Sequence, residues 1–173
     1  DRISRLRSHG ITRSPDEMSA DSPGGWYYEQ IELGYNYRMT DLQAALGSSQ
    51  LQRLDGFLAR RRHLARRYDE ILGNLPLTRP WQDPDGVSAY HLYPVWIDPG
   101  RDGQRRARIF KRLRETGIGV QVHYIPVHLQ PYYRALGHKP GDYPQAERYY
   151  AGAFSLPLFT RLTDADQDTV VTQ

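Results

Sequence analysis

The chain has 173 residues, of which 39% are hydrophobic and 25% are charged, so it can hold one good domain or a small domain with part of another. No apolar run reaches the roughly 18 residues that a membrane-spanning helix needs, and no signal segment opens the chain, so no membrane partner is expected. The formal net charge is +3, and the absence of cysteine excludes a disulfide framework and cysteine metal sites, which fits a cytoplasmic protein.

The chain opens with a segment that has Ile3 and Leu6 on one helical stripe, which predicts a helix that closes at Gly10. Residues 11–33 are rich in Ser, Pro and Gly and form a loop long enough to indicate a function. The opening has neither an initiator Met nor an N-cap, and a last helix, predicted after Thr163, stops with its apolar face barely begun. Both ends are therefore expected to be cut, so that the chain is a fragment.

A polar and aromatic segment, residues 34–40, leads into a long helix predicted over residues 41–72. Thr40 and Gln43 have the spacing of a capping box, in which each side chain satisfies a free N–H group at the helix start. Apolar residues recur at helical spacing along this helix, with an irregularity expected near Gly56. The junction holds its side chains rigidly ahead of a positive helix end, which suits an anion such as phosphate, although many capped helices bind nothing.

Residues 74–173 are predicted to form a small α+β domain in which strands and helices alternate around one sheet. Pro94 places the first strand at an edge or a bulge, and Gly117 is a natural residue to end a helix. Residues 1–73 are interpreted as the end of a larger α/β domain plus the long connecting helix. The elements expected after residue 74 are strands at 90–97, 119–124 and 155–159, and helices at 103–116, 131–136, 144–153 and from 163 onward.

Basic residues are almost all arginines, because only Lys111 and Lys139 are lysines among 23 Lys and Arg. Arginines cluster at 60–62, 66–67 and 105–106, which leaves a nucleic-acid-binding domain as one alternative. Acidic residues interrupt these clusters, so a solvated surface of mixed charge is the favoured interpretation. No nucleic-acid partner is expected.

The segment Gly34–Gly47, GYNYRMTDLQAALG, resembles the DegT/StrS family of pyridoxal-phosphate sugar aminotransferases. WYYE at residues 26–29 and GVQVHYIPVHLQPYY at residues 119–133 narrow the resemblance to the branch that aminates a UDP-linked 4-keto sugar on the way to pseudaminic acid. The resemblance covers essentially the whole chain. It implies the C-terminal part of a type I PLP-dependent aminotransferase fold, with the end of the large α/β domain, the connecting helix and the small α+β domain.

By this resemblance, the enzyme moves an amino group from glutamate to a UDP-linked 4-keto-6-deoxy-N-acetylhexosamine, using pyridoxal 5'-phosphate in a homodimer with sites shared across the interface. Neither Lys111 nor Lys139 suits the Schiff-base role, because both positions look solvated. In the family this lysine lies upstream of the segment that begins with Asp1, so the chain is expected to hold no catalytic residue and to be inactive alone. The alternative is a non-catalytic relative that acts as a regulatory or binding module.

The resemblance implies that Asn36 and Arg38 bind the cofactor phosphate of the other subunit. An amide and a guanidinium are both good phosphate partners. The local alternatives are an Asx turn made by Asn36 and an ion pair between Arg38 and Asp41. Which of the two side chains touches the phosphate stays open.

His123, Tyr124 and His128 follow a predicted strand, a common position for binding residues. Aromatic rings and histidines offer a UDP-sugar stacking surfaces and hydrogen-bond donors. The alternatives are structural histidines or a metal pair, but no carboxylate lies between the two histidines, so no metal is expected. Three aromatic residues of the first loop could line the same pocket or simply pack the loop: Trp26, Tyr28 and Tyr35.

Overall fold

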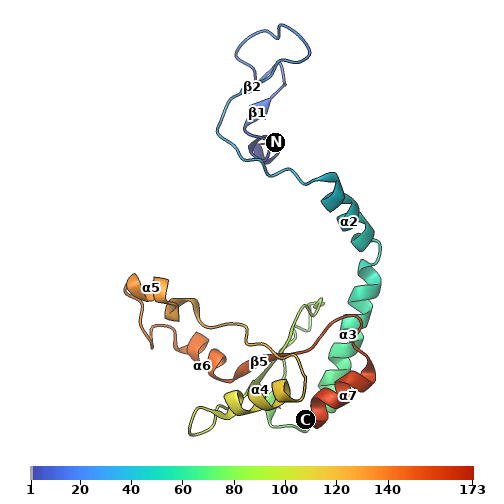
Figure 1. Ribbon diagram of the computed structural model, residues 1–173, viewed down its shortest axis with the longest axis vertical. Helices are drawn as coiled ribbons and strands as arrows, with labels where there is room; N and C mark the ends of the chain where they lie inside the picture. The colour runs from blue at the N-terminus through green and yellow to red at the C-terminus, as the bar shows by residue number, and fades with distance from the viewer. Residues whose placement is uncertain (1) are drawn as a thin grey trace. The chain divides into compact units, whose positions relative to one another are not determined.

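The computed structural model describes residues 2–173 and contains two compact units, which are considered separately (Figure 1). Unit 1 extends to Arg53, and unit 2 runs from Leu54 to Gln173. This division falls inside the segment expected to be the connecting helix. The domain boundary after residue 73 stays a prediction about the larger fold.

Unit 1 contains little regular structure, and polar contacts organise it. Its β1 and β2 form an antiparallel pair that the sequence did not predict, with Ile11 opposite Gln30. Of its described residues only Gly10 and Thr12 are buried, so no hydrophobic core supports this ladder. Its elements are α1 (Arg2–Leu6), β1 (Ile11–Thr12), β2 (Glu29–Gln30) and α2 (Asp41–Leu51).

Arg5 is the centre of the contacts that stabilise unit 1. Its guanidinium pairs with Glu32 at 2.8 Å and with Glu17 at 2.7 Å, and Glu17 also accepts a hydrogen bond from the Thr12 hydroxyl at 2.7 Å. Gly10 has a φ of +70°, and a Cβ there would lie 1.8 Å from the carbonyl oxygen of Glu32. Glycine is therefore required at position 10, where the chain passes close to the backbone of Glu32.

The helix predicted over residues 41–72 is two helices in the structure, α2 and α3 (Leu54–Ile71). The interruption lies at Gln52 and Arg53, not near Gly56. The predicted capping box at the start of α2 is confirmed by reciprocal hydrogen bonds between Thr40 and Gln43.

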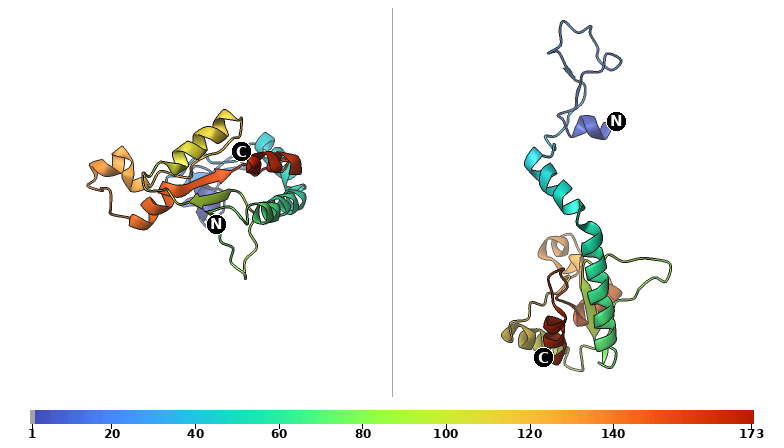
Figure 2. Two further views of the ribbon diagram at one scale, coloured as in Figure 1. Left: turned by 90° about the horizontal axis from the view of Figure 1, so that it is seen from below. Right: turned by 90° about the vertical axis from the view of Figure 1, so that its right-hand side faces the viewer.

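Unit 2 is built on a three-stranded antiparallel sheet in the order β3-β4-β5. Figure 2 shows α7 beside α3, and α4 and α6 contact each other and the sheet. The elements are β3 (Leu77–Thr78), β4 (Tyr93–Ile97), α4 (Arg105–Glu115), the 3-10 turn η1 (Val127–Leu129), α5 (Pro131–Ala135), α6 (Pro144–Gly152), β5 (Ala153–Leu156) and α7 (Asp164–Thr172). No described helix in residues 2–173 is both long and apolar enough to cross a membrane.

Two expectations about the sheet of unit 2 are corrected. The strand predicted at 119–124 is an extended segment that makes a single bridge, between Gln121 and Ser155. The strand carrying Pro94 is central and not at an edge. Proline is tolerated there because β3 pairs only with Trp96 and Ile97, so no neighbouring strand on that side needs an N–H group from residue 94.

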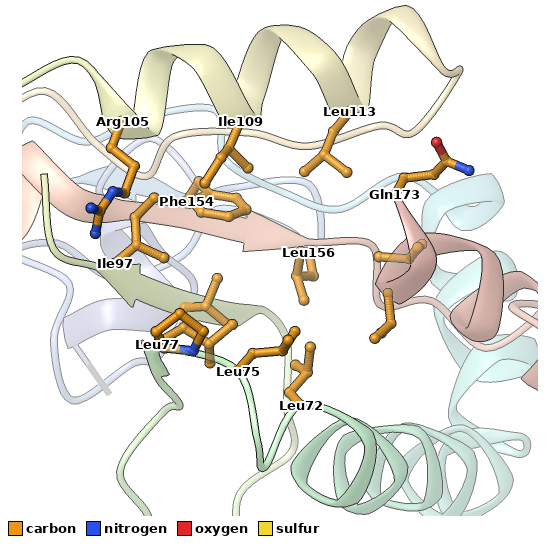
Figure 3. A pocket seen from close by; sticks show the side chains of 14 residues that line it. Leu72, Leu75, Leu77, Ile97, Arg105, Ile109, Leu113, Phe154, Leu156 and Gln173 are labelled. Carbon is orange, nitrogen blue, oxygen red and sulfur yellow. The ribbon is translucent and has the colours of Figure 1, made fainter. Parts of the chain in front are cut away.

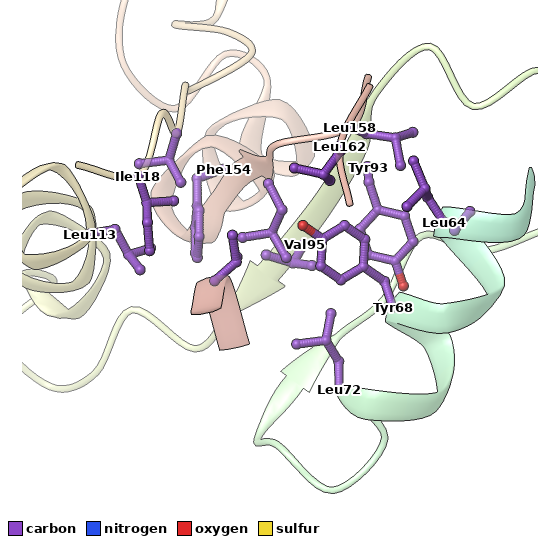
Figure 4. Close-up of a cluster of buried hydrophobic side chains, with 14 of the residues drawn as sticks. Leu64, Tyr68, Leu72, Tyr93, Val95, Leu113, Ile118, Phe154, Leu158 and Leu162 are labelled. Carbon is purple, nitrogen blue, oxygen red and sulfur yellow. The ribbon is translucent and has the colours of Figure 1, made fainter. Parts of the chain in front are cut away.

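The hydrophobic core lies wholly in unit 2 and joins the sheet to α3, α4 and α7 (Figure 4). At its centre the rings of Tyr68 and Tyr93 lie 4.9 Å apart. Each hydroxyl has a partner, since Tyr68 donates to the carbonyl of Pro157 at 3.0 Å and Tyr93 to the Asp69 carboxylate at 2.6 Å. Burial without loss of hydrogen bonds allows both phenols to fill the core.

Candidate functional site

The segment that carries Asn36 is fixed against the first helix of unit 1. The Tyr35 N–H donates to the Leu6 carbonyl at 2.7 Å, and the Tyr37 N–H donates to the Arg7 carbonyl at 2.9 Å. The rings of Tyr35 and Tyr37 stack with centroids 4.9 Å apart. Because side chains alternate along an extended segment, Asn36 points away from this stacked pair.

Asn36 and Arg38 are exposed, and within residues 2–173 neither side chain has a hydrogen-bond or ion-pair partner. The two local alternatives, an Asx turn and an Arg38–Asp41 pair, are therefore not formed in the described chain. Asp41 adds negative charge to the first turn of α2. An anion ahead of α2 would consequently need Asn36 and Arg38, because the helix end alone is partly neutralised.

The aromatic loop of unit 1 is held by one carboxylate that sequence analysis missed. Glu29 accepts hydrogen bonds from the Ser19 N–H, the Ser19 hydroxyl, the Ala20 N–H and the Tyr27 hydroxyl, at 2.7–3.1 Å. These hydrogen bonds, of which the one from the Ser19 N–H has the largest effect, hold the pKa of Glu29 below its ordinary value. Two of the predicted substrate-binding residues, Trp26 and Tyr28, are left exposed.

In unit 2 the predicted histidine–tyrosine loop starts from the bridge between Gln121 and Ser155. Nδ1 of His123 lies 2.9 Å from Oγ of Ser155. The rings of His123 and Tyr124 meet edge to face at 4.7 Å, across a cis peptide bond. His123 is half-buried and Tyr124 is exposed, so one face of this pair is accessible.

His128 does not lie beside His123 and Tyr124 in a common cluster. Its side chain is only 7% exposed, its Nε2 lies 2.8 Å from Oε1 of Glu147, and its ring packs against Tyr143. Glu147 also accepts from the Gly141 N–H at 2.7 Å. The hydrogen bond from His128 is the largest cause of a lowered pKa at Glu147. The structure thus gives His128 an internal partner, and its contact with substrate stays a prediction.

The expectation of a solvated arginine face on α3 is wrong for residues 60–62 and 67, which make structural contacts, whereas Arg66 is exposed as expected. The guanidinium groups of 60–62 are half-buried and bond the carbonyls of two loops, and Arg67 pairs with Asp168 at 2.6 Å. No spacing in the sequence identifies these distant partners. Arg60 donates to Leu162, Arg61 to Tyr90, His91 and Leu158, and Arg62 to Ser88.

An apolar pocket of unit 2 lies between the sheet, α4 and the end of α7, with a volume of about 510 Å³ (Figure 3). Only Arg105 and Gln173 bring polar side chains to its lining. Neither lysine reaches it, because Lys111 is exposed and pairs with Glu115, and Lys139 is exposed. The pocket therefore offers no group for nucleophilic or acid–base chemistry.

The family model for DegT/DnrJ/EryC1/StrS aminotransferases matches residues 1–173. The chain belongs to this family. Its mixed α+β structure matches part of known type I PLP-dependent aminotransferases, so the predicted fold class is confirmed. As a member of the DegT/DnrJ/EryC1/StrS family, it is a relative of PLP-dependent sugar aminotransferases.

Relatives of this family member include the spore coat polysaccharide biosynthesis protein SpsC of Bacillus subtilis, with 41% identity over 99% of this chain and 44% of SpsC. The aminotransferase TlmJ of Streptoalloteichus hindustanus matches with a TM-score of 0.82 and 33% identity, over 99% of this chain and 42% of TlmJ. Helicobacter pylori PseC, an aminotransferase involved in the biosynthesis of pseudoaminic acid, gives a TM-score of 0.84 and 27% identity, over 98% of this chain and 43% of PseC. The chain thus spans less than half the length of these relatives.

The described residues fit only one part of the family's cofactor. The free amide of Asn36 and the free guanidinium of Arg38 suit its phosphate. A Schiff-base lysine needs a partly desolvated position, and both lysines of the chain are exposed. The described residues therefore include side chains that suit a phosphate, and neither lysine is placed as the nucleophile.

Proposed function

We propose that this chain is part of a PLP-dependent enzyme that transfers an amino group from glutamate to a UDP-linked 4-keto-6-deoxy-N-acetylhexosamine. Family membership over the whole chain supports the reaction class. The likeness to PseC supports a sugar of the pseudaminic acid type. The reactive lysine belongs, in this proposal, to a part of the enzyme outside residues 1–173.

The observation that carries the proposal is segment 35–37 of unit 1, whose backbone is hydrogen-bonded to Leu6 and Arg7. It presents Asn36 and Arg38 without competing partners, next to a capped helix. A backbone that is already held in place reduces the conformational entropy lost when its side chains bind an anion. We assign these two side chains to the cofactor phosphate bound in a second subunit.

A homodimer with shared sites is supported by the surface of unit 1. Large apolar side chains in and before α2 are exposed, and α2 buries none of its residues. Such a surface is typical of protein contacts, and a second copy of the enzyme is the partner we propose. The exposed residues are Leu33, Tyr37, Met39, Leu42, Leu46 and Leu51.

The sugar nucleotide is assigned to the remaining predicted residues. In unit 1 these are Trp26, Tyr28 and Tyr35, whose exposed rings offer stacking surfaces. In unit 2 these are His123 and Tyr124, of which Tyr124 is exposed, and His128, whose side chain is 7% exposed. Bound pyridoxal phosphate supplies the electron-withdrawing ring for amino transfer, and the residues of this chain bind and orient.

Cofactor retention in the full-length enzyme tests the assignment of Asn36. Asn36→Ala should raise the dissociation constant of pyridoxal phosphate by roughly 10- to 100-fold, because a hydrogen bond to a charged group is lost. Asn74→Ala is the matched control, since Asn74 is also exposed and has no side-chain partner among the described residues. Dialysis followed by absorbance of the bound cofactor measures both variants.

The shared site is tested with mixed dimers. A subunit with Asn36→Ala, paired with a subunit that lacks the reactive lysine, should regain one good site per dimer. Equal cofactor loss in Asn36→Ala and Asn74→Ala would remove Asn36 from the site. Failure of the full-length enzyme to aminate any UDP-4-keto sugar would refute the substrate and favour a non-catalytic role.

A further inference from the structure

Ser155 is the one residue of β5 that connects the sheet to the histidine–tyrosine loop. It is 4% exposed and lies opposite Pro94 in the ladder between β4 and β5. Its N–H donates to the Gln121 carbonyl at 2.7 Å, and its carbonyl accepts from the Gln121 N–H at 3.4 Å. Both backbone groups of Ser155 are therefore directed to the loop, and proline, which has no N–H, is tolerated on the other side.

The Ser155 side chain continues this connection to His123. Its Oγ lies 2.9 Å from Nδ1 of His123, and within residues 2–173 it has no other side-chain or backbone partner. His123 lies two residues beyond Gln121, so the backbone bridge and the side-chain contact join the same loop to the same residue of β5. The position of the ring is thus fixed by a buried strand.

The chemistry of the pair favours one tautomer of the neutral imidazole. A buried hydroxyl hydrogen without an acceptor is costly, and Nδ1 of His123 is the acceptor within reach. If the hydroxyl donates to Nδ1, the proton of a neutral imidazole must sit on Nε2. Nε2, for which the described residues offer no partner, is then a donor on a half-buried ring.

We infer that Ser155 is a positioning residue that fixes the Nε2–H tautomer of His123 and so makes this histidine a hydrogen-bond donor to the sugar nucleotide. This inference rests on the proposed function for the role of His123. The oxygens of a sugar nucleotide (phosphate, carbonyl and hydroxyl) accept hydrogen bonds, so a donor fits them and a bare ring nitrogen does not serve phosphate or carbonyl oxygens. Ser155 itself touches no substrate.

The tautomer is measured directly in the full-length enzyme by nitrogen NMR of labelled histidine. His123 should show a protonated Nε2 in the unaltered protein. Ser155→Ala should shift His123 toward a mixture of tautomers, and Ser155→Thr, which keeps the hydroxyl, should restore the Nε2–H form. A protonated Nδ1 in the unaltered enzyme, or no change in Ser155→Ala, would overturn the inference.

Kinetics separate positioning from general damage to the fold. Ser155→Ala should raise KM for the UDP-sugar on the order of three- to tenfold, the effect of one hydrogen bond, and leave the glutamate half-reaction unchanged. In a His123→Ala background the same change should have no further effect, because Ser155 acts through His123. An equal additional loss in that background would overturn the inference.

Two outcomes distinguish this inference from the proposed function. If Ser155→Ala changes the tautomer but leaves the KM for the UDP-sugar unaltered, Ser155 still positions His123, and it is the contact between His123 and the sugar that is refuted. If instead Asn36→Ala fails to weaken the cofactor while the tautomer and KM respond as expected, the cofactor assignment falls and the Ser155 inference stands.

Discussion

Unit 1 and unit 2 belong to one chain but depend on different interactions. Unit 2 encloses a core from Leu64 to Val170. The described part of unit 1 buries no hydrophobic side chain, and its loops are held by the carboxylates of Glu17, Glu29 and Glu32. Carboxylates and glycines can fix a precise local shape without a core, whereas stability of the chain comes from burial of apolar area.

The difference has a functional meaning. A surface without a core can present many side chains, as unit 1 does with Trp26, Asn36 and Arg38. A unit with a core can hold one loop rigidly, as unit 2 does through Ser155 and Glu147. In the proposed function, both arrangements place binding groups in advance of a ligand.

The largest expected difference between the units is the cost of removing a leucine side chain. Leu64→Ala in α3 should lower the free energy of unfolding of the chain by about 2–5 kcal/mol, because Leu64 is fully buried. Leu42→Ala in α2 is the matched control, and its effect should stay within about 0.5 kcal/mol, because this side chain is 85% exposed. Urea unfolding of the 173-residue chain measures both, and equal costs would contradict the comparison.

A pH titration should destabilise unit 2 at alkaline pH and unit 1 at acid pH. Burial raises the pKa of Tyr68 from 10.0 to about 12, and burial with the Asp69 hydrogen bond also raises that of Tyr93. Since the folded pKa is the higher one, this stabilisation of unit 2 is complete below pH 10.0 and is lost as pH rises through about 12. Tyrosinate absorbance follows the transition, and Tyr68→Phe should remove the Tyr68 part of it.

The acid limb of the same titration concerns unit 1. Hydrogen bonds from Thr12, from the Ser19 N–H and from Arg5 lower the pKa of Glu17, Glu29 and Glu32, respectively, from 4.5. The stabilisation is present above pH 4.5 and is lost as pH falls through the lowered values. As pH falls, protection of amide hydrogens against exchange, relative to the intrinsic rate at each pH, should therefore decrease in residues 11–33 before it decreases in β4, and the reverse order would contradict the comparison.

The smallest expected effect comes from the two capping boxes. Thr163→Ala should cost unit 2 about 1 kcal/mol, because Thr163 caps α7, which packs against α3. Thr40→Ala removes the same kind of cap from α2, which buries no residue, so it should fray α2 and leave the main unfolding transition unchanged. Chemical denaturation and hydrogen exchange of the two variants together test whether α2 contributes to global stability.

Local chemistry in the sequence predicted the elements that local chemistry fixes. The capping box at Thr40, the proline that begins α6 and the positive φ of Gly117 after α4 all lie where predicted. The fold class came from the resemblance carried by long ordered motifs. The capping box, the proline and the glycine each depend only on residues within one or two helical turns.

The remaining features depend on partners that are distant in the sequence. The segment 119–124 has the composition of a strand but finds only Ser155 as a ladder partner. His128 meets Glu147, and the arginines of 60–62 meet carbonyls far along the chain. No periodicity encodes these pairings, so the geometry around the candidate residues could not be predicted from the sequence.

The arginines of α3 also limit which replacements the chain can accept. One nitrogen of Arg61, Nη1, donates toward three carbonyls, those of Tyr90, His91 and Leu158, at 3.0–3.2 Å. A guanidinium keeps its charge and its planar donors at every pH at which the protein is folded, whereas lysine offers one compact ammonium that loses its proton in alkali. Exchange of arginine for lysine is therefore not conservative here, and the preference for arginine at these positions reflects geometry as well as charge.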